Sequence, residues 1–167
     1  MPNHLSILGI IHTAISIIAI LTALFTLYRY GYISTKNPSG RLYIFLTIIT
    51  CVTGFPIMKT GHLTGGHYLG ILILILLPIG IYAKQLRIFG KFTTYVQVVV
   101  LSATLFFSFV PAIIESLTRL PISHPLADGP NSPIIQKGLL FLVVLFIAGV
   151  IYQLIKLRAA NKVEGER

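Results

Sequence analysis

The stretch LSILGIIHTAISIIAILTALFTLY, residues 5–28, contains no Asp, Glu, Lys or Arg. A helix rises about 1.5 Å per residue, so about 20 apolar residues cross the roughly 30 Å hydrocarbon core of a bilayer. The whole chain has this character, because 55% of its 167 residues are hydrophobic, only 10% are charged and the mean hydropathy is +0.88. Average soluble domains carry about 25% charged residues. The composition therefore excludes a soluble enzyme, a disordered chain and a nucleic-acid-binding module, and predicts an integral membrane protein.

Four more apolar segments follow the first. The sequence predicts an all-α bundle of five transmembrane helices in a single domain, over residues 5–28, 42–58, 67–83, 92–114 and 134–155. The second and third helices are at the short limit for a crossing, so a re-entrant hairpin with four crossings is the alternative. Lys59, Gly61 and Gly65 separate these two segments with a proper loop, which favours five.

The distribution of positive charge predicts the orientation. Ten of the thirteen Lys and Arg residues follow the odd-numbered crossings, and only Lys59, Arg119 and Lys137 fall on the other side. Cytoplasmic segments are rich in Lys and Arg. We therefore expect the N-terminus outside and the C-terminus in the cytoplasm of a bacterial-type inner (plasma) membrane. Residues 115–133 would form an outer loop, and residues 156–167 a frayed polar tail.

Small and polar residues predict which helix faces touch, because lipid offers no hydrophobic driving force between helices. In the first helix they recur at spacings of 4, 3, 4 and 3, which is one stripe of an α-helix. The predicted contact residues are His12, Ser16, Ala19, Ala23 and Thr26 in the first helix, Thr47, Thr50, Cys51 and Gly54 in the second, Gln97, Thr104 and Ser108 in the fourth, and Gly138, Ala148, Gly149 and Gln153 in the fifth. These stripes predict a compact bundle in which all helices touch.

All five histidines fall in the outer half of this topology: His4, His12, His62, His67 and His124. His12 lies about 10 Å into the first helix. A histidine inside a bilayer is costly and usually faces the bundle interior or a cavity. His12 and His67, on different helices near one membrane surface, could ligate haem iron axially, with His62 as a spare ligand. Imidazole suits Zn and Cu equally.

The ordinary alternatives are structural. The five-residue spacing of His62 and His67 does not place two ligands on one helix face, and no H-E-x-x-H motif is present. His12 could simply hydrogen-bond to another helix. Glu115 is expected to pair with Arg119 one turn later. The sharper hypothesis makes Glu115 a proton acceptor beside the histidines, as a quinol-oxidising site would need.

Three short stretches carry a resemblance: HTAIS at 12–16, GRLY at 40–43 and TGHLTGGHYLG at 60–70. They resemble a group of small, uncharacterised bacterial multi-pass membrane proteins, in which a histidine early in helix one and another opening helix three recur. The arrangement is also similar to membrane b-type cytochromes, which hold haem between histidines on different helices. The resemblance implies at most an outer haem b, because the cytoplasmic half of this chain has no histidine.

Three functional hypotheses follow. The first is an outer-face protein that binds haem, or Zn or Cu, through His12 and His67, with His62 and Glu115 nearby. It would serve redox chemistry, electron transport or cofactor handling, with a quinone or another membrane protein as partner. The second is a non-enzymatic accessory or assembly subunit of a larger membrane complex, since no catalytic motif is visible. A small transporter with GHLTGGH as its entrance is a third.

Overall fold

The computed structural model describes residues 6–57, 61–86 and 89–165, and in this part of the chain the fold is all-helical. The helices are α1 (Ile7–Tyr30), α2 (Pro38–Gly54), α3 (Gly65–Tyr82), α4 (Thr93–Arg119) and α5 (Pro133–Gly165), with a short 3-10 helix, η1 (Gly90–Phe92), leading into α4. Four of them are long and apolar enough to cross a membrane: α1, α3, α4 together with η1, and α5. The predicted all-α class and the membrane character agree with this arrangement.

Local sequence signals set the helix ends. Ser6 precedes α1 and its hydroxyl accepts a hydrogen bond from the backbone N–H of Gly9 at 3.1 Å. Gly31 ends the same helix with φ +78°, a left-handed conformation that glycine adopts without strain. Pro38 occupies the first turn of α2, where its missing N–H costs nothing.

Several predicted boundaries are wrong. The second helix, predicted at 42–58, lies four residues earlier, at Pro38–Gly54, because Pro38 starts its first turn. The outer loop does not begin at residue 115, because α4 continues to Arg119, where the ion pair between Glu115 and Arg119 spans one helical turn. The tail from residue 156 is not frayed, because α5 continues to Gly165. The tail residues Leu157 to Ala160 are all good helix formers, which favours this continuation.

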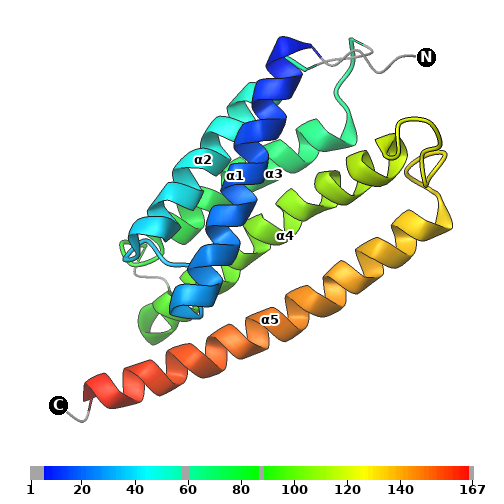
Figure 1. Cartoon of the computed structure of the whole chain (residues 1–167). Helices are drawn as coiled ribbons and strands as arrows, with labels where there is room; N and C mark the ends of the chain where they lie inside the picture. The colour runs from blue at the N-terminus through cyan, green and yellow to red at the C-terminus, as the bar shows by residue number, and fades with distance from the viewer. Residues whose placement is uncertain (1–5, 58–60, 87–88, 166–167) are drawn as a thin grey trace.

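The helices form two antiparallel pairs and one outlier. α1 packs along α2, α3 packs along α4, and the pairs meet through α2 with α3 and through α1 with α4. α5 packs against α4 alone and diverges from the other helices (Figure 1). The prediction that all helices touch is therefore wrong. Ala148, expected at a contact, is exposed, whereas Gln153 is buried against α4.

The core lies between the first four helices. It contains Ala19, Ala23, Ile33, Tyr43, Ile44, Cys51, Ile73, Leu77, Leu101 and Leu105. A buried polar bond crosses this core from Tyr43 of α2 to Thr104 of α4, at 2.8 Å, and a second, outside it, joins Ser102 of α4 to Gln153 of α5 at 2.9 Å. Such bonds between membrane helices are each worth about 0.6 kcal/mol. The predicted contact positions are confirmed at Thr104 and Gln153, whereas their partners Tyr43 and Ser102 were not predicted.

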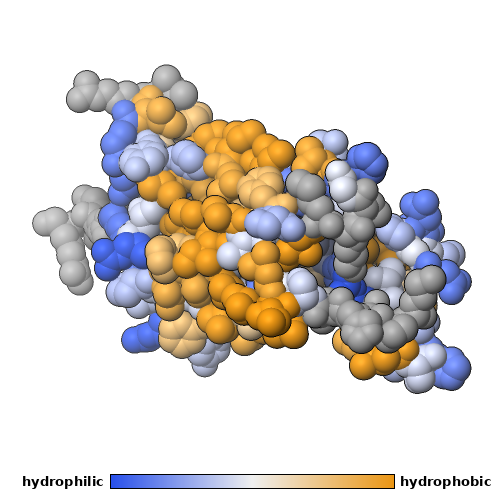
Figure 2. All heavy atoms as spheres, turned by 90° about the horizontal axis from the view of Figure 1, so that it is seen from above, coloured by the Kyte–Doolittle hydropathy of each residue, from blue (hydrophilic) through white to orange (hydrophobic). Residues whose placement is uncertain are grey.

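The surface has the pattern of a membrane-embedded bundle. Hydrophobic side chains cover the middle of the visible face, while hydrophilic ones gather towards its two ends (Figure 2). Large apolar residues such as Ile7, Phe25 and Ile155 are well exposed. A soluble monomer rarely exposes so much contiguous apolar surface.

Candidate functional site

His12 and His67 lie against consecutive residues at the end of α2. Nδ1 of His12 is 3.2 Å from the Thr53 hydroxyl, and a β-carbon at Gly54 would lie 3.1 Å from Cε1 of the same ring. Nε2 of His67 is 3.3 Å from the carbonyl oxygen of Phe55. The glycine at the end of α2 therefore leaves room for one imidazole, while the next residue binds the other.

Both ring nitrogens of His67 are used by the protein itself. The backbone N–H of Thr64 donates to Nδ1 at 3.0 Å, so Nδ1 carries no hydrogen and Nε2–H donates to Phe55. His67 thereby occupies the N3 position of a capping box, where Glu or Gln is usual, at the start of α3. The side chain is only 6% exposed. This ring caps α3 and ties it to α2, which leaves no nitrogen lone pair for a metal.

His12 keeps one nitrogen available. The Thr53 hydroxyl donates to the carbonyl of Ile49 at 2.8 Å, so its oxygen accepts from Nδ1–H of His12. In a neutral ring the lone pair then resides on Nε2. Within the described residues no hydrogen bond reaches that atom. The side chain is half-buried, on the face of α1 that meets α2.

The other histidines are not gathered around these two rings. His62 and His124 are exposed, and His4 lies outside the described residues. In the described part of the chain no group of three or more His, Cys, Asp or Glu could hold a metal ion. The described residues therefore offer no closed metal site, and His67 could ligate haem or a metal only by giving up its bond to Thr64 or to Phe55.

A cavity of about 560 Å³ lies between the start of α3 and the end of α4. Sequence reasoning missed it, although Gly65 and Gly66 remove side chains at this point. Its walls are apolar, with three polar groups: Thr64, Tyr68 and Glu115. The lining residues are Thr64, Gly65, Gly66, Tyr68, Leu69, Leu72, Pro111, Ile114, Glu115 and Pro130.

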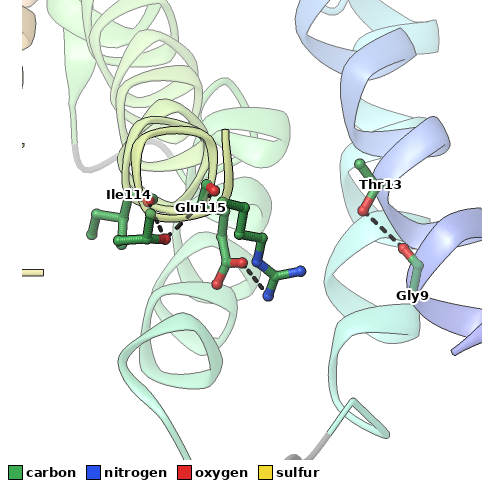
Figure 3. Close-up of polar contacts among 6 residues, drawn as sticks. Gly9, Thr13, Ile114 and Glu115 are labelled. Carbon is green, nitrogen blue, oxygen red and sulfur yellow. Dashed lines mark hydrogen bonds and ion pairs between the residues drawn. The ribbon is translucent and has the colours of Figure 1, made fainter. Parts of the chain in front are cut away.

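Glu115 is the one sequence candidate in this cavity wall. Its carboxylate forms an ion pair with Arg119, and its side chain is 55% exposed. Figure 3 shows this pair within α4, and the hydroxyl of Thr13 donating to the carbonyl of Gly9 within α1. The predicted pairing is confirmed. The carboxylate is thus held by Arg119 at the wall of the cavity.

Comparison of this chain with protein-family models, with curated proteins and with solved structures finds no match. The resemblance to small bacterial membrane proteins and to b-type cytochromes stays a prediction.

Proposed function

We propose that the chain is an inner-membrane protein with five crossings, the N-terminus outside, and an outer-end cavity that binds a small amphipathic molecule of the quinone type. α2 has 17 residues and is about 26 Å long, close to the hydrocarbon thickness of a bilayer. It packs along α1 over this length, which supports counting it as the fifth crossing. The excess of Lys and Arg after odd-numbered crossings supports the orientation.

The cavity between α3 and α4 carries the ligand proposal. Small-molecule sites are concave, mostly apolar and equipped with a few convergent polar groups. A quinone or quinol ring has apolar faces and two oxygens at opposite edges. The Glu115 carboxylate accepts from a quinol hydroxyl, and the hydroxyl of Tyr68, which also lines the cavity, donates to a quinone carbonyl. The volume of about 560 Å³ is of the size that small-molecule sites occupy.

The chain contains no Trp, so a single Trp becomes a specific reporter. In a Tyr68→Trp variant, we expect a short-chain benzoquinone to quench the fluorescence saturably, because the ring would bind beside the reporter. The control is Tyr28→Trp, at a residue that is 90% exposed on α1. It should show only linear collisional quenching. Linear quenching in both variants would overturn the proposal and favour an accessory subunit.

A matched pair of glycine substitutions localises the site. A β-carbon at Gly66 would meet only the Thr64 hydroxyl, at 3.7 Å, an ordinary contact distance, so Gly66→Leu places its side chain in the cavity wall. Gly70→Leu lies one turn later on α3, outside the cavity wall, and its β-carbon meets nothing within 4 Å. When each is combined with Tyr68→Trp, Gly66→Leu should abolish saturable quenching and Gly70→Leu should retain it.

A second candidate function is the binding of haem, or of Zn or Cu, by His12. The observation that favours it is the Nε2 lone pair left by the bond to Thr53. A haem bound there would supply a redox-active iron. The test is an absorption spectrum and metal analysis of protein purified from haem-replete cells, repeated for His12→Ala. A Soret band or bound metal that disappears in the variant supports this candidate, and a colourless, metal-free wild type rejects it.

A further inference from the structure

A second hollow lies on the other side of α4, between α1, α4 and α5. It has a volume of about 390 Å³, and its walls are almost entirely apolar. Leu24 and Leu27 of α1 form one side, Phe106 and Phe109 of α4 the floor, and Gly149 of α5 the other side. We call this hollow the α5 groove. It exists because α5 packs against α4 but not along α1.

The dimensions of the α5 groove suit a hydrocarbon chain. Its α5 wall extends from Gly138 to Gln153, which is about 22 Å along the helix axis. A second helix about 10 Å across would need roughly 1,700 Å³ over that length, far more than the groove offers. At Gly149 a β-carbon would meet nothing within 4 Å, so the groove is open at that point.

A lysine stands at one end of the α5 groove. Lys156 follows the lining residue Gln153 by one turn of α5. Its stem crosses the C-terminal cap of α1, where a β-carbon at Gly31 would lie 3.5 Å from Cγ of Lys156. Nζ is 6.0 Å from the centre of the Tyr152 ring. The side chain is exposed.

Among the side chains that the structure describes, those of residues 6–57, 61–86 and 89–160, no carboxylate pairs with this ammonium group. The ion pair found there joins Arg119 to Glu115, at the opposite end of α4. The groove therefore combines an apolar trough with one positive charge at its mouth. A single molecule with a hydrocarbon chain and a negatively charged headgroup matches both features.

We propose that the α5 groove binds an anionic phospholipid, with one acyl chain in the trough and its phosphate beside Lys156. The lipid fills the space between α5 and α1 and holds α5 against the bundle. The site is separate from the cavity between α3 and α4, and it does not depend on the proposed quinone ligand.

The test compares phosphatidylglycerol with phosphatidylcholine of the same acyl chains, added to delipidated full-length protein and counted by native mass spectrometry. We expect phosphatidylglycerol to bind more tightly to the wild type. Lys156→Gln should lower this preference by about fivefold, the effect of one basic residue near an anionic headgroup. Lys91→Gln, an equal change of charge at an exposed lysine beside Phe92, should leave it unchanged.

A second pair of variants tests the trough. Gly149→Leu should abolish tight binding of both lipids, whereas Ala148→Leu, at the exposed neighbouring position, should not. Equal binding of the two lipids by the wild type would overturn the proposal. So would an equal effect of the Lys156 and Lys91 variants, which would indicate only general attraction to a basic surface. If Gly149→Leu fails to fold, the lysine pair still decides.

Discussion

Gln97 is the residue whose replacement should most weaken this bundle. Its side chain is 1% exposed and joins three parts of the chain. The amide oxygen accepts from the Ser34 hydroxyl at 3.1 Å, and the amide nitrogen donates to the Gly80 carbonyl at 2.9 Å and to the Thr35 hydroxyl at 3.3 Å. Gly80 lies in the last turn of α3, where carbonyls lack a partner within the helix. Gln97 of α4 thus caps α3 and holds the loop between α1 and α2.

Gln97→Leu keeps the approximate size of the side chain and removes all three bonds. At about 0.6 kcal/mol for each bond in a membrane protein, the direct loss is about 2 kcal/mol. The Gly80 carbonyl is then left without its partner in a buried place, which adds about 1–2 kcal/mol. We therefore expect the free energy of unfolding to fall by about 3–4 kcal/mol.

The assay is reversible unfolding in mixed micelles at increasing fractions of denaturing detergent, followed by circular dichroism. The control is Gln85→Leu, at an exposed glutamine just beyond α3, which should change the free energy of unfolding by less than about 0.5 kcal/mol. If Gln97→Leu is no more destabilising than this control, the buried network does not hold the bundle, and the argument from hydrogen bonding is wrong.

Three further predictions concern the cap, a close contact and the topology. His67→Ala should lower the free energy of unfolding by about 1–2 kcal/mol, because the cap of α3 is lost. His67→Gln should restore most of this stability, since glutamine is a standard capping-box residue. If the glutamine variant is as unstable as the alanine variant, the capping role is wrong. Gly40→Ala should prevent folding, measured as loss of monodisperse protein, because its β-carbon would overlap the backbone oxygen of Ser34; a normally folded variant would refute this contact. In a Cys51→Ala background, a membrane-impermeant maleimide applied to intact cells should label Ser123→Cys but not Gln85→Cys, and the reverse result would invert the proposed orientation.

For the histidines, the sequence predicted which residues to consider but not the role of each one. Two of the histidines that the sequence singled out do come together, since His12 and His67 both contact the end of α2. The pattern could not distinguish a ligand from a cap, because that depends on the bonds made by each ring nitrogen. Thr64 lies three residues before His67, which is the spacing of a capping box, but the motif is usually recognised by Glu or Gln at the second position. The Phe55 carbonyl, which accepts a hydrogen bond from the other ring nitrogen of His67, lies at the end of a different helix, α2.

The cavity beside Glu115 could not be predicted from the sequence either. Its walls come from α3, α4 and the loop before α5, and a volume between helices depends on how far they diverge. The pairing of Glu115 with Arg119 was predictable, because it depends only on the four-residue spacing within one helix.

The sequence alone determined the features that depend on residues close together in the chain. The helices and their approximate limits follow from long apolar runs, and the buried stripe of α1 follows from small residues at helical spacing, because both depend on neighbours in the chain. The position of α5 was decided by the tertiary structure. Its small residues predicted a place in a compact bundle, yet only α4 offers partners to Gln153 and Gly138, so α5 diverges and the α5 groove opens. Which helix packs against which depends on the fit of two surfaces, and that fit cannot be read from either helix by itself.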